Sequence, residues 1–515
     1  MLAAVRSAAL VGIDAYDVIV EVDAAPGLPQ WTIVGLAAGA VKESRERVGA
    51  ALLNSGFEVP PRRITVNLAP ADVRKEGSAF DLPIAVGILI ATGQLDATAA
   101  NNRTFVGELG LDGGLRTIRG ALSVARHVHR QRISELVLPP ANVLEASRVS
   151  ELKLAAPAFL RDLVADLREG TLCGEVASRR EAPRAEDSAD FSEVVGQQSA
   201  KRALEVAAAG GHNVLLIGPP GAGKTMLARR MPTILPALTE EEALEVIAIH
   251  SVAGVLEQNG VSSGVRPFRA PHHTISSAGL IGGGPNPRPG EVSLAHHGVL
   301  FLDEMLEFPR HVLDALRQPM EDAKVVIARA ALAVTYPARF TLIGASNPCP
   351  CGRNGDPSGA CACSPGDVDR YNARISGPLV DRIDMHVTVG AVALRDLSDA
   401  STGEKSLSIR RRVEAARDRQ RRRFARICGV SCNAYANGRW LDSKTPVHSD
   451  ARRLLQTAAE KLALSARGYH RVLKVARTIA DLESANEISA AHVAEALRYR
   501  PVARNSARMV PAVAG

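Results

Sequence analysis

A glycine-rich octapeptide constrains the fold of this chain more than any other feature. The apolar run Val214–Ile217 precedes it, and the helix-prone segment Met226–Arg230 follows it. The octapeptide fits the pattern G-x-x-x-x-G-K-[ST], whose glycines let the backbone wrap closely around phosphates with its N–H groups pointing inward. A strand, a phosphate loop and a helix in this order predict an α/β fold that binds a nucleoside triphosphate. The loop consists of Gly218, Pro219, Pro220, Gly221, Ala222, Gly223, Lys224 and Thr225.

The last two residues of the loop carry its chemistry. In this motif the lysine, here Lys224, reaches the β- and γ-phosphates, and the hydroxyl of Thr225 ligates Mg²⁺. The N-terminus of the following helix favours the anionic phosphates. The expected cofactors are therefore ATP and Mg²⁺.

Two further apolar runs end in polar side chains suited to hydrolysis. Gly298–Leu302 reads as a buried strand that ends in Asp303 and Glu304. We expect Asp303 to face the Mg²⁺ and Glu304 to orient and polarise the attacking water. Phe340–Ser346 is another apolar strand, and the amide of Asn347 after it can hold that water against the γ-phosphate. The alternative for the acidic pair is a buried strand with two carboxylates at its end.

Length and composition set the broad class. At 515 residues the chain is long enough for about three domains. No apolar run reaches the length of a membrane span, and Met1–Gly12 reads as a first strand rather than a signal peptide, so we expect a cytoplasmic protein without membrane contact. The net charge of +7 permits nucleic-acid binding without proving it.

The chain separates into three blocks and a linker. The first block alternates strand-like runs at Val18–Asp23 and Arg63–Leu68 with helix-like runs at Val41–Leu53 and Leu82–Thr92. The last block is mostly helical, and Ser489 is a plausible N-cap for its final helix. The expected boundaries are 1–170 for the first domain, 171–192 for a polar linker, 193–393 for the nucleotide-binding core and 394–515 for a helical domain.

These parts in this order resemble the AAA+ ATPases, and more narrowly the magnesium-chelatase-like branch that includes the YifB/ComM family. The resemblance covers essentially the whole chain. It implies an N-terminal Lon-protease-like α+β domain of the S5 fold, a central AAA+ core and a C-terminal helical lid. The segments that carry it are Asp190–Gln197, Phe268–Thr274, Gly290–Gly298, Arg374–Asp384, Ser465–Arg471 and Val475–Asp481.

The resemblance also implies a homo-oligomeric ring, a hexamer, with ATP at the subunit interfaces. In such rings an arginine from the neighbour stabilises the transition-state charge. Arg382 matches this arginine finger, with Arg374 as the second candidate and a surface salt bridge as the alternative for each. Arg467 matches the sensor arginine of the lid, and Arg471, one turn later, could replace it.

By the same resemblance the protein is expected to be a motor on single-stranded or branched DNA, with helicase or branch-migration activity. The segment 266–297 resembles an insertion in the second ATPase helix, and 321–339 resembles a pore hairpin with Lys324 and Arg329. Solvated arginines at hairpin tips are the alternative. Arg410–Arg426 reads as a charged helix that is either solvated or bound to DNA or a neighbouring subunit. The rival functions are a magnesium-chelatase-type motor and an ATP-gated scaffold for a protein partner.

A cysteine cluster lies between the expected sensor and finger. Cys349, Cys351, Cys361 and Cys363 form a C-x-C…C-x-C set, and four thiolates can close a tetrahedral Zn²⁺ site. Because the spacing is tighter than the usual C-x₂-C, reduced thiols without metal remain the alternative. A metal there would brace the loop between Asn347 and Arg374.

The N-terminal block is not expected to be a protease. Lon proteases use a Ser–Lys dyad, and here Ala79 stands at the expected nucleophile position, with Ser78 one place early. The stretch expected to carry the lysine, Thr117–Ser123, has none. Because a nucleophile without its base is weak, we expect a structural or DNA-contacting domain.

Overall fold

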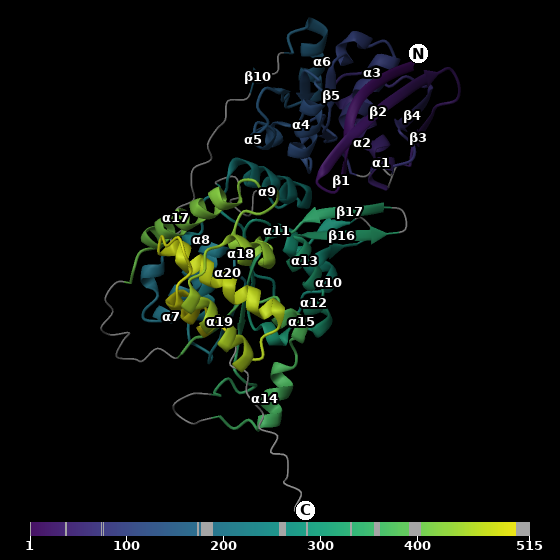
Figure 1. Cartoon of the computed structure of the whole chain (residues 1–515). Coiled ribbons are helices and arrows are strands. Elements are labelled where there is room, and N and C mark those ends of the chain that lie inside the picture. The colour runs from purple at the N-terminus through teal and green to yellow at the C-terminus, as the bar shows by residue number, and fades with distance from the viewer. Residues whose placement is uncertain are drawn as a thin grey trace, which may run out of the picture.

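The computed structural model places two bodies one above the other, the N-terminal one in purple and blue (Figure 1). The yellow and green C-terminal helices lie over one side of the lower body. The structure describes residues 2–36, 39–73, 75, 77–172, 175–176, 189–256, 264–284, 287–329, 332–354, 361–390 and 403–500.

The N-terminal body is built on two four-stranded sheets. In the first, β1 and β2 form a long antiparallel hairpin, β4 is antiparallel to β2, and β3 is parallel to β4. Buried side chains alternate along β2 and β4, as expected for strands with one covered face. The bounds are β1 Leu2–Val11, β2 Asp14–Ala25, β3 Gln30–Val34 and β4 Arg63–Ala69, and in the second sheet β5 Arg103–Phe105, β8 Glu135–Val137, β9 Lys153–Ala155 and β10 Glu175–Val176.

Helices cover these sheets where the sequence predicts them. The helix α3 (Asp81–Ala91) is buried along its whole length against β1 and β2, which explains its continuous apolar sequence. The helix expected over 41–53 is interrupted at Glu43, so that α1 (Gly39–Lys42) and α2 (Ser44–Asn54) are separate. The helices α4 (Ala121–Arg130), α5 (Val143–Ala146) and α6 (Leu160–Glu169) also belong to this body. Its kinship with the Lon-type domain and the predicted domain boundaries stay predictions.

The lower body is organised around a parallel five-stranded sheet in the order β12-β15-β18-β11-β19. Every residue of β15 and β18 is buried, as is typical of parallel strands covered on both faces. Because all five strands are parallel, their C-terminal ends meet at one edge. The bounds are β11 Val214–Ile217, β12 Phe268–Arg269, β15 Val299–Leu302, β18 Thr341–Ser346 and β19 Met385–Thr388.

Helices from distant parts of the chain share one core beside this sheet. The helices α7 (Gln198–Gly210) and α8 (Lys224–Ile234) pack with the C-terminal helices in a single apolar cluster. The fold is therefore α/β, with a central parallel sheet and a C-terminal helical part, as predicted. Each described helix is too short or too polar to cross a membrane. The C-terminal helices are α17 Ser406–Phe424, α18 Gly438–Lys444, α19 Ser449–Lys461, α20 Ala466–Leu482 and α21 Ala490–Arg498, the last capped by Ser489 as expected.

The two bodies are joined by α9 (Glu240–Ala253). Leu122 of α4 packs into an apolar cluster with Val246, Ile247 and Ala248 of α9. The hydroxyl of Ser251 accepts a 2.8 Å hydrogen bond from the backbone N–H of Gly120 and donates to the buried carboxylate of Glu145. The contact thus combines apolar burial with a satisfied polar pair.

Candidate active site

The phosphate loop begins where β11, which lies between β18 and β19 in the sheet, ends. Gly221 and Gly223 have φ values of +76° and +83°, which side chains disfavour. At Gly218 a Cβ atom would lie 2.1 Å from the carbonyl oxygen of Val389, so the close approach of the chain that leaves β19 excludes any larger residue. The loop glycines are therefore required by backbone geometry, and α8 begins directly behind them at Lys224.

The Lys224 ammonium is held inside the loop. Its Nζ donates to the carbonyl oxygens of Gly218 at 2.7 Å and Pro219 at 2.9 Å, and to Oδ1 of Asn347 at 3.1 Å. Burial lowers the pKa of Lys224, while the charges of Asp303 and Glu304 act in the opposite direction. The cation is thus held at the phosphate loop, where phosphates bind in this motif.

Thr225 and Asp303 meet across the sheet edge. The Thr225 hydroxyl donates to Oδ2 of Asp303 at 2.8 Å. Asp303 directly follows β15, and β18 separates β15 from β11. A hydroxyl and a carboxylate are the hard oxygen donors that Mg²⁺ prefers, so the chemistry of this pair fits the cation.

Glu304 projects from a left-handed backbone. Its φ is +48°, its side chain is 59% exposed, and its N–H donates to Oδ1 of Asp303 at 3.0 Å. This conformation costs a non-glycine residue about 1 kcal/mol. The exposure leaves the carboxylate accessible to water beside the phosphate loop.

His273 is a neighbour of Glu304 that the sequence analysis did not single out for this position. Its Nδ1 lies 3.7 Å from Oε2 of Glu304, and its ring contacts His272 and the edge of Phe308. The signal was available, because His273 follows β12, which pairs in parallel with β15. His272, by contrast, bonds within its own loop to Thr274.

Gln197 is a second residue whose position was not predicted. It has a φ of +55°, and its side-chain amide donates to the carbonyl oxygens of Ala222 at 3.2 Å and Gly390 at 2.6 Å. The amide therefore ties the phosphate loop to the chain that leaves β19.

The candidate finger and lid arginines lie together, on one carboxylate. Nη2 of Arg382 is 2.7 Å from Oε1 of Glu321, and Nη2 of Arg467 is 3.2 Å from the same oxygen. Glu321 belongs to α13 (Arg317–Asp322). Lys224, in contrast, contacts Asn347 and the loop carbonyls. The roles of Arg382 and Arg467 stay predictions.

The two alternative arginines have other partners. Arg471 is 11% exposed, and its Nε lies 3.3 Å from Oδ1 of the buried Asp384, so it is held in the interior. Arg374 is 49% exposed and pairs with Glu307 at 2.8 Å. Of the two lid candidates, Arg467 is therefore the one near the surface.

The four cysteines converge. Their sulfur atoms all lie within 4.8 Å of one another, with Cys349 3.3 Å from Cys351 and 3.8 Å from Cys361. Edges of a tetrahedral zinc site are about 3.8 Å, since Zn–S bonds are about 2.3 Å. The backbone N–H of Asn354 donates to the Cys349 sulfur. A hydrogen bond from the backbone of Arg353, with others from the neighbouring thiols, lowers the pKa of Cys351 to about 6.

This cluster touches the nucleotide site. A Cβ at Gly352, next to Cys351, would lie 2.6 Å from Cδ of Pro220 in the phosphate loop and 3.9 Å from the side chain of Asn347. Gly352 also has a φ of +78°. The cysteine-bearing loop therefore packs directly against the phosphate loop.

The second histidine pair, His296 and His297, is held by hydrogen bonds to one carboxylate. Nε2 of His296 and Nε2 of His297 each lie 2.9 Å from Oε2 of Glu245. The backbone N–H of Arg339 donates to Nδ1 of His296, so the proton of this ring sits on Nε2 and points to the carboxylate. Burial lowers the pKa of His296 to about 4, which keeps it neutral. The cluster therefore links α9 to the start of β15 and leaves no Nε2 lone pair on His296 for a metal.

The predicted insertions form two hairpins that pack on each other. The strands β16 (Lys324–Arg329) and β17 (Leu332–Pro337) are antiparallel, as are β13 (Gly282–Gly283) and β14 (Arg288–Pro289). Tyr336 donates from its hydroxyl to the carbonyl oxygen of Pro287 at 2.7 Å. In Figure 1 the β16–β17 hairpin lies beside β1 of the upper body, and a Cβ at Gly12 would meet Val334 at 2.8 Å.

Within the segment 266–297, Phe268–Arg269 belongs to the central sheet, and the role of the segment as an insertion stays a prediction. Three arginines of the segments 266–297 and 321–339 already have partners within the fold. Arg266 donates to Glu242 and to three carbonyl oxygens. Arg269 forms a bidentate ion pair with Glu291. Arg339 donates to the carbonyl oxygen of Gly429. Arg288 and Lys324 are exposed. The side chain of Arg329 lies outside the described residues.

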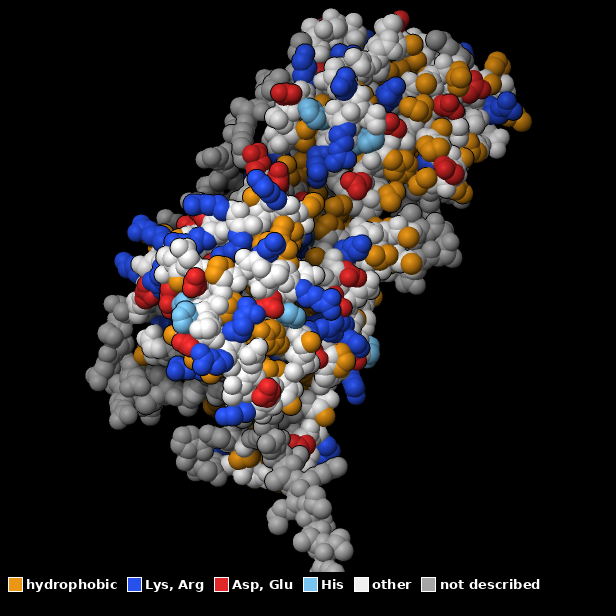
Figure 2. All heavy atoms as spheres, viewed as in Figure 1, with side chains coloured by type: hydrophobic (Ala, Val, Ile, Leu, Met, Phe, Trp, Pro, Cys, Tyr) orange, Lys and Arg blue, Asp and Glu red, His pale blue; other side chains and the backbone are white. Residues whose placement is uncertain are grey.

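Some arginines of the helix α17, which the sequence analysis expects to be solvated or bound to DNA or a neighbouring subunit, have partners within the fold, and the others are exposed. Arg423 forms a bidentate ion pair with the buried Asp481, and Arg417 donates to the carbonyl oxygen of Ala208. Figure 2 shows blue side chains along α17 on the left of the lower body. Its exposed arginines include Arg411, Arg421 and Arg422.

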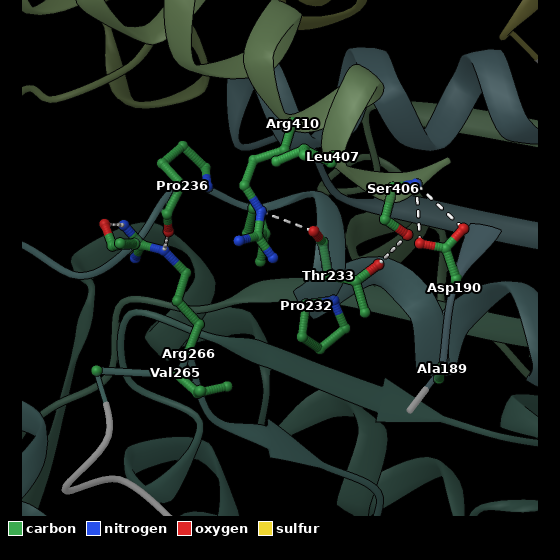
Figure 3. A pocket seen from close by; sticks show the side chains of 13 residues that line it. Ala189, Asp190, Pro232, Thr233, Pro236, Val265, Arg266, Ser406, Leu407 and Arg410 are labelled. Carbon is green, nitrogen blue, oxygen red and sulfur yellow. Dashed lines mark hydrogen bonds between the residues drawn. The ribbon is translucent and has the colours of Figure 1, made fainter. Parts of the chain in front are cut away.

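A cavity of about 260 Å³ lies at the far end of α8, away from the phosphate loop (Figure 3). There the Thr233 hydroxyl bonds to Ser406 at 2.8 Å, Arg410 donates to the Thr233 carbonyl, and Asp190 accepts from the N–H of Ser406. Since α8 has 11 residues, this end is roughly 16 Å from the loop. The cavity therefore connects linker, core and lid and is separate from the nucleotide site.

Ser78 of the N-terminal body is hydrogen-bonded to a carboxylate rather than to a lysine. Its hydroxyl donates to Oε2 of Glu108. The absence of proteolytic activity stays a prediction.

The parallel sheet, the phosphate loop and the Asp303–Glu304 pair define a P-loop ATPase of the AAA+ class. Three family models match the chain: "Magnesium chelatase, subunit ChlI" over residues 190–397, "Subunit ChlI of Mg-chelatase" over 20–142 and the ChlI C-terminal model over 403–500.

Among curated relatives, YifB of Salmonella typhimurium is 43% identical over 515 residues and competence protein ComM of Haemophilus influenzae is 43% identical over 508 residues, each match covering 98% of both chains. The magnesium-chelatase 38 kDa subunit of Rhodobacter capsulatus is 27% identical over 252 residues, 44% of this chain and 69% of that one. The chain belongs to the YifB/ComM family of magnesium-chelatase-like AAA+ ATPases.

Proposed function

We propose that the protein is a ring-forming ATPase that moves or separates DNA strands at the expense of ATP. One observation carries the ATPase part: Lys224, Thr225, Asp303, Glu304 and Asn347 converge at one sheet edge, and the chemistry of each suits one task in phosphoryl transfer. Because Arg382 and Arg467 pair elsewhere, a second copy of the chain would complete the site.

Each side chain has a separate role in this proposal. Lys224 binds the β- and γ-phosphates in place of its present carbonyl partners, and Thr225 and Asp303 would hold Mg²⁺, which neutralises developing phosphate charge when bound. Glu304 accepts a hydrogen bond from the attacking water and polarises it, and Asn347 orients that water. Arg382 of a neighbouring subunit stabilises the transition-state charge.

The DNA part rests on the relatives and on two exposed cations. The full-length relative from Haemophilus influenzae is named a competence protein, and the resemblance implies a helicase or branch-migration motor. Arg288 and Lys324 are exposed on the two packed hairpins. Cations at such positions bind backbone phosphates without sequence preference.

Lys324→Ala combined with Arg329→Ala is expected to abolish strand separation on branched DNA while basal ATP hydrolysis survives. Each phosphate contact adds about 0.9 to the slope of log affinity against log salt on duplex DNA, so the double variant should flatten that slope by about two units. The measurement is a salt titration of DNA binding by fluorescence anisotropy, with strand displacement in parallel.

Arg370→Ala combined with Arg453→Ala is the matched control, since both arginines are exposed and lie away from the hairpins. This control variant should change neither the salt dependence of DNA affinity nor the strand-separation activity. An unchanged slope in the hairpin variant, with unwinding intact, would move the DNA contact elsewhere, and the exposed arginines of α17 would be the next residues to replace.

We further propose that Cys349, Cys351, Cys361 and Cys363 bind a structural Zn²⁺, because all four sulfur atoms lie within 4.8 Å of one another and two of their separations, 3.6 Å and 3.8 Å, are close to the edge of a tetrahedral thiolate site. Purified protein should contain about one zinc per chain by elemental analysis. Cys349→Ser should lose the metal, whereas Cys428→Ser, at an exposed cysteine outside the cluster, should retain it. Metal-free wild-type protein, purified without chelator, would show that the cluster is a set of reduced thiols.

A further inference from the structure

Two arginines from different elements converge on one oxygen atom of Glu321. Arg382 follows α15 (Gly377–Val380), and Arg467 lies in the first turn of α20. Their Nη2 atoms are 2.7 Å and 3.2 Å from Oε1 of Glu321. An anion that gathers two guanidinium groups in this way occupies a position that a phosphate oxygen could also take.

The pairing immobilises Arg382 in particular. Its side chain is only 10% exposed, its Nη1 donates to the carbonyl oxygen of Pro378 at 2.6 Å, and its Nε finds no hydrogen-bond acceptor among the described residues. Arg467 and Glu321 are 55% and 44% exposed. Arg382 therefore cannot reach a ligand on another subunit while Glu321 holds it.

The surroundings leave room for an exchange of partners. An open cavity of about 390 Å³ borders the pair and is lined by Asp314, Ala315, Arg317, Gln318, Glu321 and Arg382. A γ-phosphate carries more charge and more acceptor oxygens than a carboxylate. Guanidinium groups bind both kinds of anion in the same bidentate geometry. Glu321 itself is 44% exposed, and because exposed ion pairs such as the one with Arg467 contribute little stability, such an anion can displace it.

We propose that Glu321 is an internal substitute for the γ-phosphate: it holds Arg382 and Arg467 together in the free subunit and releases them to a nucleoside triphosphate bound by a second copy of the chain. This inference rests on the proposed role of Arg382 in trans. Glu321 is then a positioning residue that competes with ring assembly, and nucleotide binding by the neighbour removes that competition.

Glu321→Gln tests this proposal, since it removes the charge and keeps the shape of the side chain. With the non-hydrolysable analogue of ATP, the protein concentration for half-maximal assembly should fall by about two- to fivefold, the range that exposed ion pairs are worth. Mass photometry measures the assembly, and ATP turnover against protein concentration should shift in parallel. Asp418→Asn, which breaks a pair with Arg421 that is about as exposed as the pair of Arg467 with Glu321, is the control and should shift neither.

Two further variants make the outcome decisive. Glu321→Asp retains the charge and should assemble like wild type, and Arg382→Ala should erase the gain that Glu321→Gln brings. If Glu321→Gln raises the assembly concentration while its melting temperature is unchanged, Glu321 supports the interface and the proposal is overturned. If Arg382→Ala hydrolyses ATP normally, the in-trans role itself fails, and this result does not depend on Glu321.

Discussion

Glu304→Gln is expected to bind ATP as wild type does and to lose hydrolysis by a factor of about 10² to 10⁴, the usual contribution of a general base. The carboxylate is 59% exposed at the end of β15, where water can reach it, and an amide of the same shape cannot polarise that water. Binding of a fluorescent ATP analogue and release of phosphate measure the two steps separately.

Lys224→Ala should instead weaken ATP binding itself, because it removes the cation that contacts the phosphates. Glu307→Gln serves as a control, since this neighbouring carboxylate pairs with Arg374 and takes no part in the proposed chemistry. Near-normal turnover by Glu304→Gln would remove Glu304 from the role of water activator.

Arg382→Ala should also inactivate the ring, by a factor of about 10³ to 10⁵ if it acts as an arginine finger. Mixing this variant with Glu304→Gln should restore activity, because some interfaces then combine an intact Glu304 with an intact Arg382. At equal amounts and random assembly, about one quarter of the interfaces in a head-to-tail ring are intact. The measurement is the rate of phosphate release across mixing ratios.

Subunit exchange has to be shown in the same samples by energy transfer between labelled chains. Recovery that peaks near the equal mixture supports the assignment in trans. A flat, inactive profile in rings that have exchanged subunits would place Arg382 in its own site or outside the chemistry.

The sequence predicted those parts of the site that are local in the chain. Gly218–Thr225, Asp303–Glu304 and Asn347 each follow an apolar strand, and in a parallel sheet the C-terminal ends of strands meet at one edge. The 2.8 Å contact of Thr225 with Asp303 and the 3.1 Å contact of Lys224 with Asn347 follow from that topology.

Contacts that depend on tertiary packing could not be read from local patterns. The sharing of Glu321 by Arg382 and Arg467 joins three elements far apart in the chain. The arginines of α17 look like a solvated surface in sequence, yet Arg423 pairs with Asp481 in the interior. Charge patterns alone cannot distinguish a solvated cation from one with a buried partner, because the partner comes from another element.

The most direct test of the central claim is the rate of ATP hydrolysis by the wild-type protein alone, with single-stranded DNA, with branched DNA and with a porphyrin. The proposed function predicts that DNA raises the rate and porphyrin does not, and that Glu304→Gln abolishes the response. Stimulation by porphyrin alone would indicate a metal-insertion motor, and a rate unchanged by every addition would contradict a motor that acts on DNA.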